Sequence, residues 1–193
     1  VNSLLSIKPL AKFAKNQARA LIIKRAEPIG VAWRDDVKFL RSRGGSEALS
    51  PQWETDLAKI TNPNLQYPTY YLTSFHAYDR GNMSWDAAME VEVAAYSVHA
   101  KIFAETGKTG DTQLRHSYHD LITQTLSTPP QHILDVGCSV GMSTFAMQEV
   151  YPDAHVTGLD LSPYFLSIAN YRAEQKQSTQ INWVHGAGEN TGL

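Results

Sequence analysis

The chain of 193 residues contains a single cysteine, Cys138. A lone cysteine cannot form an internal disulfide, and no cysteine cluster exists to hold zinc. We therefore expect a reducing compartment, the cytoplasm. No apolar run reaches the roughly 18 residues that a membrane-spanning helix needs. The formal net charge is only −2, which argues against nucleic acid as the main partner.

Residues 1–26 lack acidic residues altogether, although the whole chain has 19. Six basic residues are spread among leucines, isoleucines and a phenylalanine there: Lys8, Lys12, Lys15, Arg19, Lys24 and Arg25. Three interpretations stay open. The segment is an ordinary amphipathic helix broken near Pro9, a helix lying on an anionic membrane surface, or a transit-type segment that would direct the protein to a plastid.

Residues 1–130 show helical spacing and loops without an internal repeat, which predicts a helical N-terminal region. Ser84 is a candidate N-cap for a long helix. Prolines between residues 62 and 82 oppose a continuous helix and predict an aromatic-rich loop. Its rings either pack in the core or form a lid over a substrate pocket, where their π faces would meet a sulfonium: Tyr67, Tyr70, Tyr71, Phe75 and Tyr78.

A further helix is expected over residues 114–125, with Leu114, Tyr118 and Leu121 on its apolar face. His116 and His119 share one side of this helix, but no third strong ligand is evident. We interpret the two histidines as a solvated helix face and expect no metal site.

From Gln131 the pattern changes to short apolar runs alternating with amphipathic helices. Residues 132–136, 156–159 and 181–184 have the pattern of buried strands. Strand–helix–strand–helix–strand in about 55 residues is one half of a doubly wound parallel sheet. The predicted fold class is thus α/β. A helical region or cap over 1–130 precedes the front half of a Rossmann-like domain over 131–193.

The first strand ends in a glycine loop that runs from Gly137 to Gly141. Glycines at this turn let the backbone approach a ligand closely. Asp160 ends the next strand, 19 residues after Gly141, about where an acid receives two ribose hydroxyls. The combination predicts a cofactor that contains a nucleoside. A dinucleotide site would require G-x-G-x-x-G, and Ser139 and Met142 replace two of those glycines.

The same loop, Gly137-Cys138-Ser139-Val140-Gly141, also matches G-x-S-x-G, the nucleophile elbow of serine hydrolases. Asp160 and either His155 or His185 would complete a triad. No Gly-Gly segment follows an upstream strand to supply an oxyanion hole, and the elbow would stand after the first strand. The hydrolase is kept as an alternative.

Three ordered segments resemble class I S-adenosylmethionine-dependent methyltransferases. Residues 135–141 are similar to the first motif of that family, residues 156–160 to its second strand with the ribose-binding acid, and residues 183–189 to its adenine-side segment. The resemblance implies methyl transfer from S-adenosylmethionine to a small-molecule acceptor.

The resemblance also implies roles for individual residues. Gly137, Ser139 and Gly141 would lie against the methionine part of the cofactor. Asp135 would help to orient the amino group of that part, and Asp160 would receive the ribose hydroxyls. Leu161 would pack on the adenine. Many relatives have Asp where this chain has Ala187, so the contact with the adenine amino group would either be lost or come from the backbone of Gly188.

A complete fold of this class has seven strands, and only three are predicted here. The sequence therefore resembles the N-terminal portion of a longer protein. We expect the chain on its own to be a homo-oligomer or prone to aggregation, and a non-catalytic cofactor-binding or interaction fragment is the alternative to an enzyme. Residues 75–85 resemble a plant and cyanobacterial methyltransferase group more weakly.

Overall fold

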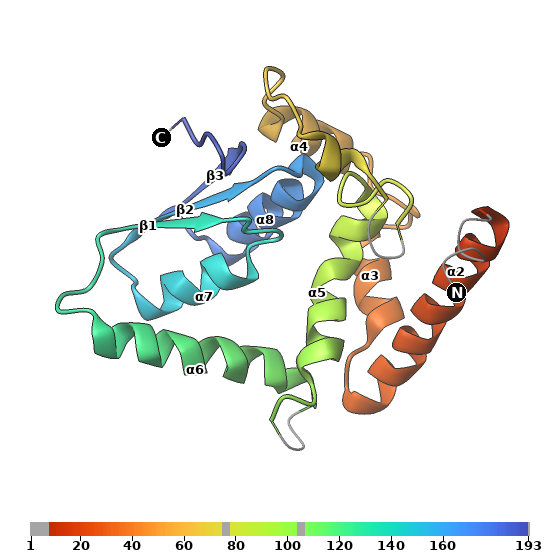
Figure 1. Cartoon of the computed structure of the whole chain (residues 1–193), viewed down its shortest axis with the longest axis horizontal. Coiled ribbons are helices and arrows are strands. Elements are labelled where there is room, and N and C mark those ends of the chain that lie inside the picture. The colour runs from red at the N-terminus through yellow and green to blue at the C-terminus, as the bar shows by residue number, and fades with distance from the viewer. Residues whose placement is uncertain (1–7, 75–77, 104–106, 193) are drawn as a thin grey trace.

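The computed structural model describes residues 8–74, 78–103 and 107–192. Its first part is helical, as expected (Figure 1). The helices and 3-10 turns are α2 (Lys8–Ala26), η1 (Glu27–Ile29), α3 (Trp33–Ser42), α4 (Gln52–Ile60), η2 (Thr69–Leu72), α5 (Trp85–His99), η3 (Gly107–Thr109) and α6 (Gly110–Thr125). The long α2 lies at one side of the molecule beside α3 and α5.

The second part alternates strands and helices: β1 (His132–Val136), α7 (Met142–Val150), β2 (His155–Asp160), α8 (Pro163–Lys176) and β3 (Ile181–His185). Within the described residues the strands form one parallel sheet in the order β1-β2-β3. Val136 pairs with Leu159, and Asp160 pairs with His185, so the strands end at the same edge. This arrangement confirms the predicted α/β fold and the Rossmann-like start of its sheet.

Local capping explains where two N-terminal helices begin. The hydroxyl of Ser84 accepts a hydrogen bond from the N–H of Ala87, which confirms the predicted N-cap of α5. Pro9 stands in the opening turn of α2, where a missing N–H costs no helical hydrogen bond. Residues 1–7 lie outside the described part of the chain, so the helix break expected near Pro9 stays a prediction.

A shared core joins the N-terminal helices to α8. Trp53 of α4 is fully buried, and Ala88 and Met89 of α5 lie with it against Ile168 of α8. The guanidinium of Arg43 lies over the Trp53 ring, with Cζ 3.6 Å from its centroid. Burying such aromatic and aliphatic side chains contributes about 1.5–3 kcal/mol each.

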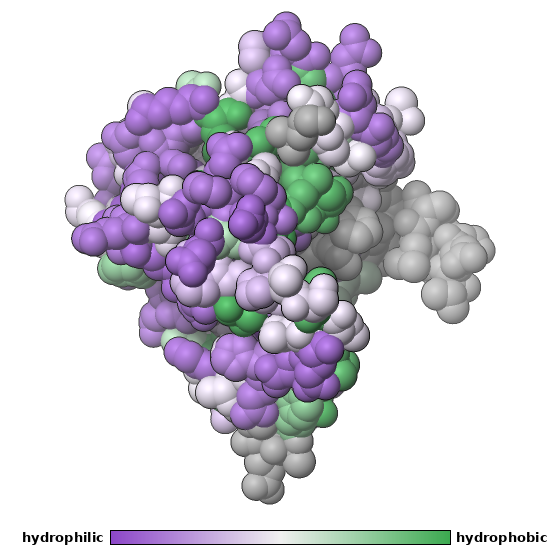
Figure 2. All heavy atoms as spheres, turned by 90° about the vertical axis from the view of Figure 1, so that its left-hand side faces the viewer, coloured by the Kyte–Doolittle hydropathy of each residue, from purple (hydrophilic) through white to green (hydrophobic). Residues whose placement is uncertain are grey.

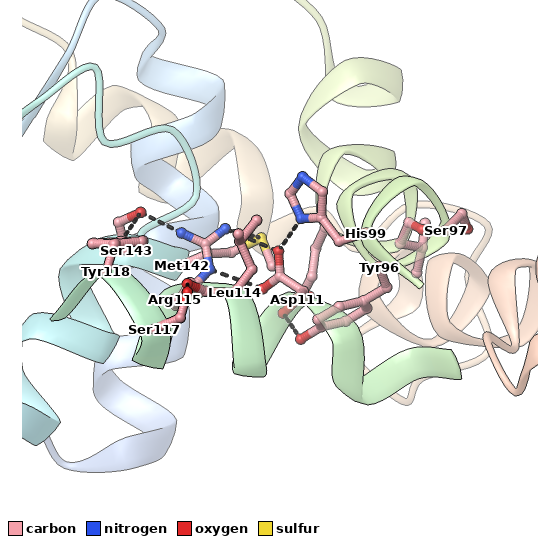
Figure 3. A network of polar contacts seen from close by, with 12 residues as sticks. Tyr96, Ser97, His99, Asp111, Leu114, Arg115, Ser117, Tyr118, Met142 and Ser143 are labelled. Atoms are coloured by element: carbon pink, nitrogen blue, oxygen red, sulfur yellow. Dashed lines mark hydrogen bonds and ion pairs between the residues drawn. The ribbon is translucent and has the colours of Figure 1, made fainter. Parts of the chain in front are cut away.

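A polar network holds α6 between α5 and α7 (Figure 3). The buried Asp111 lies 2.6 Å from Nδ1 of His99 and accepts a hydrogen bond from Nε of Arg115 at 2.8 Å. Arg115 also donates to the hydroxyl of Ser143 in the first turn of α7. These contacts fix the start of α7, and with it the end of the glycine loop.

The residues that are buried on α6 differ from the predicted apolar face of this helix. Leu121 is 63% exposed, whereas His119 is buried, so the solvated face expected for His119 was wrong. Burial disfavours the charged imidazole and lowers the pKa of His119. His116 is exposed as expected.

The face that Figure 2 shows, the left-hand side of Figure 1, is largely hydrophilic, with hydrophobic groups visible between the polar ones. Leu134 and Val136 of β1 remain 44% and 55% exposed. Within the described ranges β1 has a hydrogen-bonded neighbour only on its β2 side. No helix in the described part of the chain has the length and apolar character needed to cross a membrane.

Candidate functional site

The loop between β1 and α7 is held in an unusual backbone conformation. Gly137, Ser139 and Gly141 have φ angles of 76°, 54° and 83°, in the left-handed region that favours glycine. The N–H groups of Gly137 and Cys138 both donate to the carbonyl of Leu159, at 2.7 and 3.1 Å. The loop is thereby fastened to the end of β2.

Cys138 points away from solvent inside this loop. Its side chain is buried, and burial raises the pKa of its thiol, with Asp160 and Asp135 adding to the effect. A neutral, buried thiol is a poor nucleophile. Cys138 is therefore a packing residue of the loop.

Asp160 is the central polar group of the site. Its side chain is buried at the carboxyl end of β2 and accepts three hydrogen bonds. The N–H of Ser139 donates to Oδ2 at 2.8 Å, and the N–H of Ser162 donates to Oδ1 at 2.7 Å. The hydroxyl of Tyr71 also donates to Oδ1, at 3.2 Å. Burial raises the pKa of Asp160, although the three donors oppose this change.

A cavity of about 640 Å³ opens at this end of the sheet. Its size lies in the range of small-molecule sites. Both parts of the chain line it: Tyr70, Tyr71, Asn82, Val91, Val136, Gly137, Ser139, Leu159, Asp160, Leu161, Phe165, Gly186, Gly188 and Glu189. The position agrees with the rule that ligands bind beyond the carboxyl ends of parallel strands.

Five of the eight predicted site residues line this cavity: Gly137, Ser139, Asp160, Leu161 and Gly188. A Cβ atom on Gly137 would meet nothing within 4 Å, so the backbone there is open to a ligand. A Cβ atom on Gly188 would lie only 2.8 Å from Cγ1 of Val136. Gly188 thus allows the loop after β3 to approach β1.

The other three predicted residues do not line the cavity. Asp135 accepts a hydrogen bond at 2.7 Å from the hydroxyl of Thr144 on α7. A Cβ atom on Gly141 would lie 2.5 Å from Cη2 of Trp183, so this glycine makes room for an indole ring. Ala187 forms an isolated bridge with Asn190.

The aromatic segment between α4 and α5 forms part of the cavity wall. Tyr70 and Tyr71 line the cavity, whereas Tyr67 does not, and the lid over a substrate stays a prediction. Tyr78 instead donates to the buried Glu90, at 2.7 Å. Phe75 lies outside the described residues. Asn82 was not anticipated as a lining residue because no local pattern distinguishes it.

His185 anchors the same segment at the end of β3. Its Nδ1 accepts a hydrogen bond from the N–H of Asn62 at 2.8 Å. Its Nε2 lies 3.0 Å from the hydroxyl of Tyr67 and 3.1 Å from the carbonyl of Leu161. Burial lowers the pKa of His185, in keeping with a neutral ring that accepts at Nδ1.

The geometry lacks the contacts of a serine hydrolase. Within the described residues, the buried hydroxyl of Ser139 has no hydrogen-bond partner, and both nitrogens of His185 contact other groups. His155 stacks on His132 at the opposite end of the strands, with ring centroids 5.6 Å apart. Neither His155 nor His185 therefore stands ready to activate Ser139.

The C-terminal part of the chain is similar to known methyltransferases. Residues 133–193 match the family model described as "Methyltransferase domain". A malonyl-[acyl-carrier protein] O-methyltransferase of Paenibacillus sp. (strain JDR-2) is 28% identical over 90 residues, which cover 47% of this chain and 31% of that protein. A trans-aconitate 2-methyltransferase of Rhodopseudomonas palustris (strain HaA2) is 35% identical over 68 residues, covering 35% and 27%.

One similar solved structure is geranyl diphosphate C-methyltransferase from Streptomyces coelicolor A3(2), with a TM-score of 0.37 and 17% identity. That match covers 71% of this chain and 48% of the other. The chain covers less than a third of the length of the two curated relatives. Residues 133–193 are thus similar to the methyltransferase domains of these relatives.

Proposed function

We propose that the whole protein transfers a methyl group from S-adenosylmethionine to a small-molecule acceptor. One observation carries the proposal: the buried carboxylate of Asp160 lines a cavity beside the glycine loop of β1. A buried acid at this position costs free energy unless it binds polar groups. A ribose diol supplies two such groups, so the residues fit a nucleoside cofactor.

Each of the eight predicted site residues has a proposed task. Asp160 receives the ribose hydroxyls, and Leu161 packs on the adenine beside Gly188. Gly137 and Ser139 approach the methionine part with their backbone. Asp135 and Gly141 support the loop without lining the cavity. The carboxylate of Asp135 accepts a hydrogen bond from Thr144, and Gly141 leaves room for the indole of Trp183. Because Ala187 has no polar side chain, the adenine amino group would be bound by the backbone.

When bound, S-adenosylmethionine would supply an electrophilic methyl group: the methyl carbon would bond to a nucleophilic oxygen, nitrogen or carbon atom of the acceptor as its bond to sulfur breaks, which leaves S-adenosylhomocysteine. The chain's part in that reaction is to align the acceptor and to exclude water. The N-terminal region contributes one wall of the cavity, formed by Tyr70, Tyr71, Asn82 and Val91. We place the acceptor on that side, where orientation accounts for most of the rate enhancement.

Calorimetry on the full-length protein tests the proposal. S-adenosylhomocysteine should bind, and Asp160→Ala should weaken binding by at least about tenfold, since each charge-assisted hydrogen bond contributes about 1.5–3 kcal/mol. Binding of NADH in place of S-adenosylhomocysteine would refute the assignment. Binding without methyl transfer to any acceptor would favour the alternative of a non-catalytic cofactor-binding protein.

A second proposal concerns α2. Phe13 and Leu21 are 63% and 48% exposed on this helix, and Lys24 and Arg25 are exposed beside them. An apolar and cationic surface of this kind favours an anionic membrane. Arg19, by contrast, faces inward and donates to Glu90 at 2.9 Å. The wild type should therefore sediment with phosphatidylserine vesicles and should not sediment with vesicles of phosphatidylcholine alone. The double variant Phe13→Ser/Leu21→Ser should not sediment with either kind of vesicle.

A further inference from the structure

Three tyrosine hydroxyls of the segment after α4 reach the ends of the strands. Tyr67 contacts His185, Tyr70 donates to Glu189 at 2.6 Å, and Tyr71 donates to Asp160 at 3.2 Å. The rings of Tyr67 and Tyr71 are stacked, with centroids 6.5 Å apart. This segment therefore lies across the same edge of the sheet that forms the cavity.

The carboxylate of Asp160 has few free acceptor positions. An ionised carboxylate offers about four lone-pair sites on its two oxygens. The N–H groups of Ser139 and Ser162 and the hydroxyl of Tyr71 occupy three of them. One site, on Oδ2, is left. A ribose diol has two hydroxyl donors, so one of the existing donors has to leave before both can bind.

Tyr71 is the donor that can leave most easily. The N–H groups of Ser139 and Ser162 belong to the glycine loop and to the N-cap residue of α8, so moving them would disturb both elements. The hydroxyl of Tyr71 needs only a side-chain movement. Burial and the nearby Asp160 raise the pKa of Tyr71, so the hydroxyl stays protonated and remains a donor.

We infer that the hydroxyl of Tyr71 and the ribose diol of the cofactor compete for Asp160, which makes Tyr71 a residue that sets cofactor affinity. The inference rests on the proposed function, because it requires a nucleoside in the cavity. It has an unusual consequence: removing a polar group from the cavity wall should tighten binding. In the wild type, part of the binding free energy is spent on separating Tyr71 from Asp160.

The test compares two proteins with two ligands by calorimetry. The full-length wild type and Tyr71→Phe are titrated with S-adenosylhomocysteine and with its 2′,3′-dideoxy analogue. The Kd for S-adenosylhomocysteine should fall about three- to tenfold in Tyr71→Phe, as expected for one partly exposed charge-assisted hydrogen bond. The Kd for the dideoxy analogue should stay the same, because this ligand does not compete for Asp160.

Tyr96→Phe is the matched control. Tyr96 donates to Glu92 at 2.9 Å and does not line the cavity, so its variant should bind both ligands like the wild type. Any general loosening caused by Tyr71→Phe affects both ligands and cancels in the double comparison.

The outcomes separate the two proposals. If the wild type binds S-adenosylhomocysteine and Tyr71→Phe binds it equally or more weakly, the competition is refuted and the proposed function stands. An equal increase in affinity for both ligands also refutes the competition, because the ribose diol then plays no part in the effect of Tyr71→Phe. If neither protein binds S-adenosylhomocysteine, the proposed function fails and this inference fails with it.

Discussion

The indole of Trp183 on β3 occupies the space that a side chain at Gly158 on β2 would need. A Cβ atom on Gly158 would lie 2.5 Å from Cζ3 of that ring. The same ring blocks a side chain at Gly141 on the neighbouring loop. Phe145 of α7 meets the indole edge-on, with centroids 5.6 Å apart. Trp183 therefore gives both glycines a packing reason, to which Gly141 adds its left-handed φ of 83°.

We expect Gly158→Ala to lower the free energy of unfolding by about 1–3 kcal/mol, because the added methyl group overpacks a tight contact. Urea denaturation measures the change. The Trp183→Leu background lacks the indole ring, so Gly158→Ala should lower the free energy of unfolding clearly less there. Equal costs in the two backgrounds would mean that Trp183 does not cause the strain.

The binding of S-adenosylhomocysteine should depend on the ionisation of Asp160. Only the carboxylate accepts two ribose hydroxyls, so affinity is full above the pKa of Asp160 and falls as the pH decreases through it. Burial raises this pKa, so the loss should begin at higher pH than for an ordinary aspartate, whose value is 3.8. Calorimetry from about pH 8 to pH 4 measures the profile. The dideoxy analogue should show a much flatter one.

Stability should decrease in mild acid because of buried histidines. Burial lowers the pKa of His185 below its ordinary 6.5, so between the two values the unfolded chain binds more protons than the folded one. The stabilisation is full above pH 6.5 and is lost as the pH falls through the folded pKa. His119 acts in the same direction. Thermal melts of His185→Gln should show a shallower decrease than the wild type, and an unchanged decrease would contradict this account.

Ser139→Ala distinguishes the two enzyme classes. As a loop residue, Ser139 contributes its N–H to Asp160, and the substitution keeps that group, so methyl transfer should fall only modestly. The left-handed φ of 54° adds a small strain in both variants. A fluorophosphonate probe should leave the wild type unlabelled. Labelling of Ser139, or an esterase activity that Ser139→Ala abolishes, would instead support the serine-hydrolase hypothesis.

The strands and the edge at which Asp160 stands could be predicted because they depend on short-range patterns. The apolar runs of β1 and β2 are bounded by turn residues, and the spacing from Gly141 to Asp160 follows from one strand–helix–strand unit. Gly141 itself shows the limit of the motif. Its neighbour in space is Trp183, which no local pattern links to it.

The N-terminal contribution to the site could not be predicted for a similar reason. Tyr71 and Asp160 are 89 residues apart, so only the tertiary fold brings them together. On α6, periodicity favoured Leu121 as an inward residue, yet Asp111 and His119 are the buried ones. Asp111 is stabilised inside by Arg115, four residues along the same helix, and by His99 of α5, and the spacing within α6 does not show the second partner.

The buried thiol of Cys138 makes the glycine loop observable by chemistry. Since the chain has a single cysteine, a maleimide can react at one position only. That position is 4% exposed, so reaction requires the loop to separate from β2. The labelling rate therefore measures how often the loop opens. A ligand that contacts Gly137 and Ser139 should lower this rate in proportion to the fraction of protein that it occupies.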